Sequence, residues 1–464
     1  MKPAARALAT VVPLLVLAVA GFMLIRQLSA GLEAPAVPDA APHGPQSAGS
    51  DTLLHVLLAL VVVIAVSRAL GAVFRWLKQP PVVGEVIAGI MLGPSLLGRV
   101  APSVSAHVLP PAVAPYLGVI AQVGVLLYMF LVGLHLDLKV VRERGHTALA
   151  VSNASIVVPF IGGAGLSLWL YPRMGQSGIS FTAFALFIGV AMSVTAFPVL
   201  ARILTDRQMH KTRLGSLALA CAAVDDVSAW CLLAFLVGVV KASADRALVT
   251  IGLTAVYLCA VFFVLRPLAK RFVAWHEKQG KTSATAIAIV TGALLLSALA
   301  TEAIGIHAIF GAFLVGAVVP HDSALAKDLQ AKLEDVVVVM LLPAFFAFTG
   351  LRTQVGLVHG AEHWLALGLV LLCAFVGKMG GTLVAARATG QGWRDSLALG
   401  ALMNTRGLME LIVLNVGLDL GVLGPTLFAI MVLMAVLTTV ATGPLLNLIA
   451  QTEPELTGQP SASR

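Results

Sequence analysis

Charged residues are scarce in this chain of 464 residues, in which Asp, Glu, Lys and Arg together make up only 11%. Hydrophobic residues, by contrast, make up 59% of it. A soluble globular protein carries about 25% charged residues, so the composition excludes an ordinary protein of that class. It predicts an all-α membrane protein that crosses the lipid bilayer many times.

Cysteine is also rare, and its pattern excludes a cysteine-based metal centre. The four cysteines, Cys221, Cys231, Cys259 and Cys373, lie in apolar runs without the spacing of metal ligands. We expect them to pack as small hydrophobic side chains. No motif for a cofactor stands out either, and we expect none.

A net charge of +8 would suggest nucleic-acid binding in a soluble protein. Here the basic residues fall in short loops between apolar runs, where they orient a membrane protein in the bilayer. We therefore expect the lipid bilayer, and not nucleic acid, as a partner of this chain.

The two ends differ from the apolar middle of the chain. Residues 1–28 combine a basic start with an apolar stretch, which predicts a signal peptide or a retained signal anchor. Residues 29–51 are rich in Ala, Pro and Gly and predict a flexible external linker. Residues 52–450 form the membrane domain, and 451–464 form a short polar tail after which we expect no soluble domain.

About thirteen apolar spans follow one another from Thr52 onward. They cover 52–77, 80–98, 115–134, 147–172, 180–204, 213–240, 247–270, 283–302, 305–320, 332–353, 363–389, 394–416 and 423–449. With residues 29–51 outside, the basic loops at 139–144, 207–213 and 266–281 all face the same inner side. This bias places the C-terminus in the cytoplasm, as in a multi-pass protein of a bacterial inner membrane.

An odd number of spans divides into two halves of six, 52–240 and 283–450, joined by one linking span. The halves then start from opposite sides of the membrane, which is the inverted repeat common in secondary transporters. The fifth span of each half is interrupted by polar or helix-breaking residues. These are Ser193, Thr195 and Pro198 in MSVTAFPVL, and Asn404, Thr405, Arg406 and Gly407 in MNTRGLMEL.

Two adjacent acids, Asp225 and Asp226 in AAVDDVSAW, lie in the middle of an otherwise uncharged span. Ionisable residues at this depth are costly and usually mark an ion path. Lys378 is similarly placed in the fourth span of the second half and needs a carboxylate partner. One acid paired with Lys378 leaves the other free to bind a monovalent cation or, because burial favours the neutral form, a proton. Competition of these ions for one carboxylate is the minimal chemistry of an antiporter.

Arg406 and Glu410 are four residues apart and share one face of a helix. An ion pair that braces the broken helix and a direct role in transport are equally open for them. Two other classes of protein remain as alternatives, a cation channel and an intramembrane aspartyl protease. The protease chemistry requires two carboxylates that face each other and share a proton, whereas neighbours on one helix point about 100° apart.

Eight motifs carry a resemblance to a known family. They are QPPVVGEVIAGIMLGPSLLG, YMFLVGLHLDL, AFPVLARIL, AAVDDVSAW, HAIFGAFLVG, FFAFTGLRT, GKMGGTLVAAR and MNTRGLMELIVLNVG. In this order they resemble the monovalent cation:proton antiporter-2 family, which includes Kef-type potassium/proton and bacterial sodium/proton antiporters. The resemblance spans residues 52–450, which are thereby expected to form a cation/proton exchanger domain.

The resemblance implies thirteen helices in a dimerisation scaffold and a mobile core, with two crossed discontinuous helices and an elevator-like alternating access. It implies a homodimer. It also implies that Asp226 binds the sodium or potassium ion and the proton, that Asp225 pairs with Lys378, and that Thr195 and neighbouring Ser193 add oxygen ligands. Pro198, Asn404, Arg406 and Glu410 belong to the broken helices and their polar network.

The chain departs from the family pattern at two places. His135 stands where the family often has Glu, which leaves the role of that acid without a counterpart. Kef-type members carry Gln-Asp at the paired position, where this chain has Asp225 and Asp226. This pair resembles the sodium/proton branch, which is often electrogenic, so we expect sodium/proton exchange, with potassium/proton exchange as the alternative.

Overall fold

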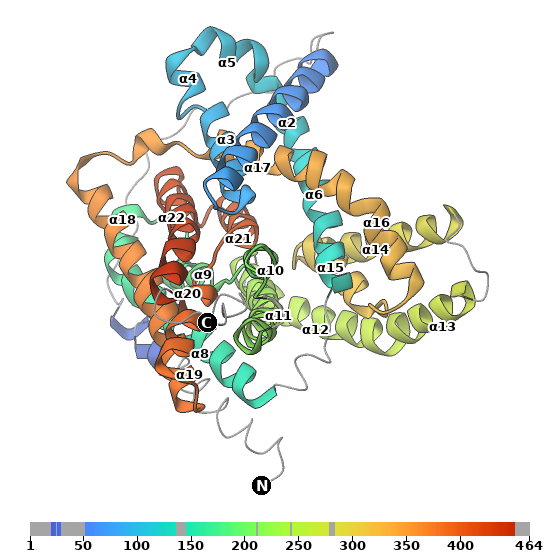
Figure 1. The fold of residues 1–464 in the computed structure, drawn as a ribbon. Coiled ribbons are helices and arrows are strands. Elements are labelled where there is room, and N and C mark those ends of the chain that lie inside the picture. The colour runs from blue at the N-terminus through green and yellow to red at the C-terminus, as the bar shows by residue number, and fades with distance from the viewer. Residues whose placement is uncertain are drawn as a thin grey trace, which may run out of the picture.

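The computed structural model describes residues 20–24, 26–28, 52–135, 145–209, 212–241, 244–277 and 284–450. Every regular element in these ranges is a helix, so the predicted all-α fold is confirmed (Figure 1). The linker 29–51 and the tail 451–464, which were predicted from composition, lie outside the described residues. The described part of the N-terminal segment is helical, and the ring of Phe22 lies 6.1 Å from that of Phe160.

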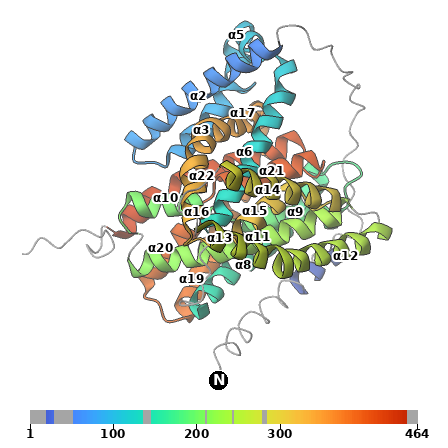
Figure 2. The same ribbon diagram turned by 90° about the vertical axis from the view of Figure 1, so that its right-hand side faces the viewer.

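The helices pack into two bundles. The first bundle contains α2 (Thr52–Trp76), α3 (Pro81–Leu92), α6 (Ala114–His135), α14 (Ala284–Ile304), α15 (Ala308–Val318) and α16 (Ala324–Val336), which continues through η3 (Val337–Leu341) into α17 (Leu342–Arg352). Short helical turns α4 (Leu97–Val100), α5 (Pro102–Val108) and η1 (Pro111–Val113) connect α3 to α6. Figure 2 shows α2, α3 and α17 together at the top of the molecule.

The second bundle holds the helices that carry the predicted site. It contains α8 (Gly145–Met174), α9 (Phe181–Ser193), α10 (Phe197–Asp206), α11 (Arg213–Lys241), α18 (Gly360–Phe375), η5 (Val376–Gly380), α19 (Gly381–Ala388), α20 (Trp393–Met403), α21 (Leu408–Asp419) and α22 (Pro425–Ala450). The turn η4 (Val355–Leu357) leads from α17 into α18. Between the halves of the chain, α12 (Ala244–Ala260), η2 (Val261–Leu265) and α13 (Arg266–Glu277) run along the outside of the molecule (Figure 1).

Each half of the chain contributes to both bundles in the same order. The first half places α2, α3 and α6 in the first bundle and α8 to α11 in the second. The second half places α14 to α17 in the first bundle and α18 to α22 in the second. The fifth span of each half is broken, as α9 and α10 in one half and α20 and α21 in the other. The two-half organisation predicted from the spans is therefore present.

The predicted number of thirteen spans is not confirmed for the described residues. Eleven helices are long and apolar enough to cross a membrane, or twelve if α20 and α21, bent by 44°, count as one span. The predicted span 305–320 corresponds to α15, which has only 11 residues. A helix of that length rises about 17 Å and is shorter than the hydrocarbon core of about 30 Å. The flanking His307 has φ of 77° and the segment after Val318 is extended, so the helix stops at both ends.

Close backbone contact between α3 and α17 holds the first bundle together. A methyl group added to Gly89 of α3 would lie 2.6 Å from the carbonyl carbon of Phe346, and Gly350 faces Gly89 across the same contact. Small residues at a helix crossing allow two backbones to approach, which is how helices gain packing energy inside a membrane. The crossing therefore has no room for a side chain at Gly89.

We predict that Gly89→Ala lowers the stability of the purified protein by about 1–3 kcal/mol through overpacking. The matched control is Gly292→Ala in α14, where an added methyl group meets nothing within 4 Å. Alanine favours a helix over glycine, so the control should be neutral or slightly stabilising. The melting temperature in detergent, followed by tryptophan fluorescence, compares them. Equal melting temperatures would contradict the tight crossing.

Candidate cation site

The break between α9 and α10 is a short extended segment. Val194 and Ala196 have φ, ψ of −64°, 137° and −97°, 89°, so the helix cannot continue through them. Pro198 lies in the first turn of α10, where its missing N–H costs no helical hydrogen bond and its fixed φ suits a helix start. The polar and proline residues that were predicted to interrupt this span thus define the end of one helix and the beginning of the next.

The two broken helices meet at their breaks. The N–H of Ala196 donates to the carbonyl of Thr405 at 3.0 Å. In the second break, the N–H of Arg406 donates to the hydroxyl of Thr439 at 3.2 Å, and that hydroxyl donates to the carbonyl of Arg406 at 2.6 Å. Unwound backbone deep in a membrane protein requires such partners. At the crossing, backbone groups freed by the breaks are therefore bonded to each other and to Thr439 of α22.

Two buried cations cover the C-terminal end of α9. Arg406 donates to the carbonyls of Ala191 at 2.9 Å and Met192 at 2.6 Å, and Lys378 donates to the carbonyl of Ser193. The last carbonyls of a helix lack intrahelical partners and carry partial negative charge. Both side chains are fully buried. The cations thus satisfy carbonyls that the break has freed.

Arg406 also forms an ion pair with Glu410 at 2.9 Å, and both side chains are 0% exposed. Glu410 lies in the first turn of α21, where an acid is favoured by the helix dipole. Because Arg406 holds α9 with the same guanidinium group, the pair fastens one broken helix to the other. This geometry favours the bracing role for Arg406 and Glu410.

The carboxylate of Asp225 is bonded to four other side chains. It lies in α11 and is fully buried. Its Oδ1 accepts from Ser152 at 2.5 Å, and its Oδ2 accepts from Ser155 at 2.7 Å, from Thr195 at 2.6 Å and from Lys378 at 3.3 Å. Three hydroxyls and an ammonium group thus stabilise this carboxylate, and its charge is matched by that of Lys378.

Asp226, the next residue, has a contrasting environment. It is only 3% exposed, and neither carboxylate oxygen has a hydrogen-bond partner among the described residues. Asp225, Lys378 and the backbone of Phe197 at the start of α10 are within electrostatic reach of it. A buried charge without partners is strongly unfavourable, so this acid needs either a bound cation or a proton.

Asn404 at the second break has a similar property. Its side chain is fully buried, and neither its oxygen nor its nitrogen has a partner among the described residues. The preceding residue, Met403, accepts a hydrogen bond on its carbonyl from Thr195 at 3.5 Å, which places Asn404 next to the first break. Asn404 is therefore a second polar side chain at the crossing that lacks partners in the described part of the chain.

The structure brings Asp225, Lys378 and Thr195 together. The repeat predicted that one of the two acids meets Lys378, and the family resemblance implied that this acid is Asp225. The hydroxyls of Thr195 and Ser193 are engaged as donors: Thr195 donates to Asp225, and Ser193 donates to the carbonyls of Ile156 and Gly189. Their role as cation ligands stays a prediction. Sequence reasoning missed Ser152 and Ser155, whose spacing of three residues on α8 could have indicated a polar helix face.

Two crossed broken helices with a buried and unsatisfied carboxylate beside them define an ion-coupled secondary transporter. Residues 56–451 match the family model described as sodium/hydrogen exchanger, transmembrane. The chain belongs to the sodium/hydrogen exchanger family. The resemblance found in its motifs is thereby confirmed.

Two similar sequences agree with this family. The chain is 44% identical over 398 residues to the Na(+)/H(+) antiporter NhaS4 of Synechocystis sp., covering 85% of this chain and 97% of that protein. It is 42% identical over 392 residues to cation/H(+) antiporter 18 of Arabidopsis thaliana, covering 84% of this chain and 48% of the plant protein. The chain thus spans about half the length of the Arabidopsis relative.

A more distant relative and a fold match extend this comparison. K(+)/H(+) antiporter 1 of Saccharomyces cerevisiae is 32% identical over 412 residues, covering 86% of this chain and 47% of the yeast protein. The sodium proton antiporter MjNhaP1 from Methanocaldococcus jannaschii has a similar fold, with a TM-score of 0.64 at 14% identity over 88% of this chain and all of that one.

We predict that Lys378→Met lowers stability by about 3–5 kcal/mol, because it leaves Asp225 buried without its counter-charge. Adding Asp225→Asn should recover most of this loss, since the neutral side chain needs no ammonium partner. Melting temperatures of the two single variants and the double variant in detergent form the test. Strictly additive losses would show that the two side chains do not interact.

Proposed function

We propose that this protein exchanges sodium ions for protons across the membrane by alternating access. The observation that carries the proposal is the contrast between the neighbouring acids, one bonded to four side chains and the other to no side chain among the described residues. Of these two acids, Asp226 is the one whose oxygens have no side-chain partner among the described residues and can bind an ion. The fully bonded Asp225 holds the surrounding side chains in place and balances the charge of Lys378.

The exchange follows from the electrostatics of Asp226. A sodium ion neutralises its buried carboxylate and binds to the oxygens that lack partners. When the ion leaves, burial disfavours the bare charge, so the carboxyl takes up a proton. Because cation and proton bind to the same group, they cannot cross together. After the site has released the cation on one side of the membrane, it therefore returns to the other side with a proton, and the reverse.

The relatives support sodium first and potassium second. NhaS4, which is covered over 97% of its length, is named a Na(+)/H(+) antiporter, whereas the yeast relative is named a K(+)/H(+) antiporter. Oxygen ligands alone do not separate the two ions, because selectivity depends on cavity size and ligand number. Potassium/proton exchange is therefore the second candidate.

The division into two bundles suits an elevator-like motion. The second bundle contains both broken helices and both acids, so it would move as a unit against the first and carry the ion. In this proposal the first bundle forms the scaffold and the interface of a homodimer, and the C-terminus lies in the cytoplasm at a bacterial inner membrane. The basic loops on one side support this orientation.

The other classes considered from the sequence fit the geometry less well. The protease mechanism needs two carboxylates facing each other from separate helices, whereas Asp225 and Asp226 adjoin on α11 and Asp225 is already engaged by Lys378. A channel would need no proton binding in step with the cation. It would dissipate a sodium gradient without proton counterflow.

Proton flux in proteoliposomes against gradients of sodium, potassium and lithium tests the proposal. We expect sodium-driven proton flux in the wild type and none above empty liposomes for Asp226→Asn, which cannot alternate between ion and proton. Asp225→Asn should retain partial activity with altered coupling, since it changes the charge beside the site but not the binding oxygens.

The melting temperature of each variant serves as the control for folding in this assay. Sodium-driven proton flux in a well-folded Asp226→Asn protein would refute the assignment of the binding carboxylate. Sodium flux without proton counterflow in the wild type would indicate a channel instead.

We also predict that exchange is electrogenic. Asp226 can carry one proton, and Lys378 can carry a second if it releases its proton when the cation binds and regains one when the cation leaves. Two protons would then move in one direction for each cation that moves in the other. A membrane potential of 100 mV then contributes about 2.3 kcal/mol per charge moved. Potentials set with valinomycin in sodium-loaded proteoliposomes should change the initial rate. A rate that does not vary with the potential would show electroneutral exchange.

A further inference from the structure

The contact between the two bundles differs between its two ends. With a cytoplasmic C-terminus, α22 runs inward, so α21 ends at the outer side of the membrane, and so does α17 two spans earlier. Gly93 at the end of α3 packs against Gly350 near the end of α17, so α3 also ends at the outer side and begins at the inner side. The inner and outer parts of the interface can therefore be compared through the residues on α3, α17, α21 and α22.

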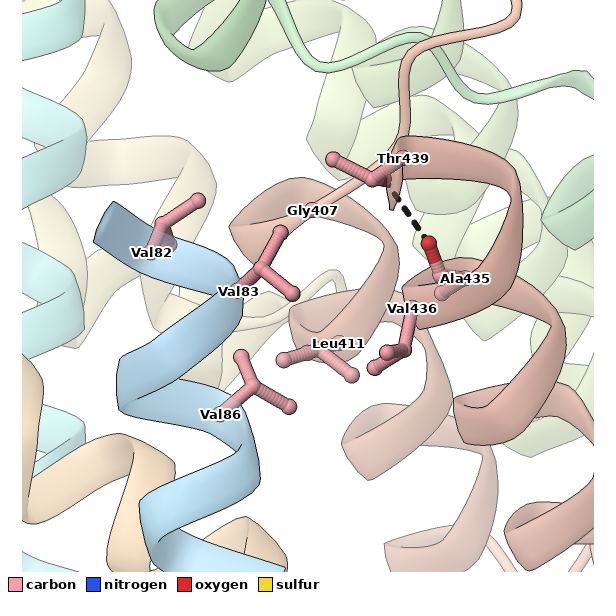
Figure 3. Close-up of a pocket in the computed structure, with 8 residues that line it drawn as sticks. All are labelled: Val82, Val83, Val86, Gly407, Leu411, Ala435, Val436 and Thr439. Atoms are coloured by element: carbon pink, nitrogen blue, oxygen red, sulfur yellow. Dashed lines mark hydrogen bonds between the residues drawn. The ribbon is translucent and has the colours of Figure 1, made fainter. Parts of the chain in front are cut away.

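On the inner part the bundles meet across an apolar crevice (Figure 3). Its walls are almost entirely aliphatic and come from α3 of the first bundle and from α21 and α22 of the second: Val82, Val83, Val86, Gly407, Leu411, Ala435, Val436 and Thr439. The hydroxyl of Thr439 donates back to Ala435 in its own helix and to Arg406, so no hydrogen bond to α3 uses it. Aliphatic walls can slide without breaking directional bonds.

At the outer end a polar bridge joins the bundles. Its members are Thr349 and Arg352 on α17 and Asn415 and Asp419 on α21. Arg352 donates to Asn415 Oδ1 at 3.1 Å and to Asp419 Oδ1 at 2.5 Å, and Asn415 Nδ2 donates to Thr349 Oγ1 at 2.8 Å. The guanidinium carbon also lies 5.1 Å from the ring centre of Phe348, which steadies the side chain.

This bridge connects a helix of the first bundle directly to the second half of a broken helix. The side chains of Thr349 and Asn415 are buried, whereas Arg352 and Asp419 are 23% and 46% exposed. A relative displacement of the bundles by even one helical turn, about 5 Å, would separate all three hydrogen bonds. The bridge can therefore exist in only one of the alternating states.

We propose that Thr349, Arg352, Asn415 and Asp419 form an external latch that stabilises the inward-facing state and must open in every transport cycle. This inference rests on the proposed alternating access and names residues that set the balance between its states. The latch acts on the population of states and not on the ion, because none of its members lies at the crossing of the broken helices.

The consequence is measurable as an apparent affinity. Sodium arriving from outside binds only to the outward-facing fraction of the protein, so its half-saturation concentration varies inversely with that fraction. Loss of a partly exposed ion pair shifts such a balance by a factor of about 5 at most. Arg352→Gln and Asp419→Asn should therefore each lower the external half-saturation concentration about threefold to fivefold in right-side-out vesicles. The charge-exchanged variant, Arg352→Asp with Asp419→Arg, should restore most of the wild-type value.

A second ion pair provides a matched control. Arg173 on α8 and Glu362 on α18 are 3.2 Å apart, are 40% and 59% exposed, and lie at the same outer side. Arg173 is also stacked over an aromatic ring, that of Trp169, at 4.4 Å. Both residues belong to the second bundle, so their separation does not change when the bundles move. Arg173→Gln and Glu362→Gln should leave the external half-saturation concentration unchanged.

Cross-linking tests the opening of the latch directly. In a background with the four native cysteines replaced by alanine, a short bis-methanethiosulfonate reagent, which forms a disulfide with each thiol by displacing methanesulfinate and is cleaved by a reducing agent, would join Arg352→Cys to Asp419→Cys. A reagent is needed because ion-paired long side chains keep their backbones too far apart for a disulfide. Cross-linking should lower exchange at least tenfold, with recovery on cleavage. The pair Arg173→Cys and Glu362→Cys should stay active when cross-linked.

The outcomes separate this inference from the proposed function. Absence of exchange with sodium, potassium and lithium in the wild type overturns both. If the wild type exchanges but cross-linked Arg352→Cys and Asp419→Cys remains fully active, the latch alone is refuted. The latch is likewise refuted if Arg173→Gln changes the external half-saturation concentration as much as Arg352→Gln does.

Discussion

The C-terminal end of α9 imposes the constraint on which the rest of the site depends. Its helix stops in the middle of the protein and leaves carbonyls that water cannot reach. Lys378 and Arg406 from the other half of the chain donate to three successive carbonyls there. Each cation then needs an anion, and Asp225 and Glu410 provide them. A single interruption of one helix thus accounts for four of the buried charges.

The same arrangement makes two adjacent acids chemically different. Successive residues on a helix point about 100° apart, so Asp225 and Asp226 face separate surroundings. Asp225 points toward hydroxyls of α8 and the first break and toward Lys378, and these groups hold its charge in place. Asp226 meets no such donors among the described residues. In the proposed exchange, Asp225 therefore supplies a fixed charge and Asp226 the exchangeable one, so an ion would leave the site without disrupting the bonds around Asp225.

The contacts within each bundle differ in kind from the contacts between the two bundles. Within the first bundle, Gly89 and Gly350 allow backbones to touch, which favours a rigid unit. Within the second, hydrogen bonds between the breaks fasten the crossed helices to each other. Between the bundles, an aliphatic crevice on one part and a few polar side chains on another leave fewer directional bonds to break. Two stiff bundles with few directional bonds between them suit the proposed elevator-like motion.

The sequence alone was enough to predict a helical, membrane-spanning chain in which Ser193 to Pro198 and Asn404 to Gly407 interrupt corresponding spans. It also predicted that Asp225, Asp226 and Lys378 lie within the membrane. Apolar run length, helix-breaking residues and the cost of charge in lipid are local properties, so they can be recognised without a structure. Other features became visible in the folded chain alone: the shortness of α15, the bonds from Ser152 and Ser155 to Asp225, the bond from Lys378 to the carbonyl of Ser193, and the ion pair of Arg352 with Asp419. Each of these depends on the distance between segments far apart in the chain, which helix packing sets and no local pattern records.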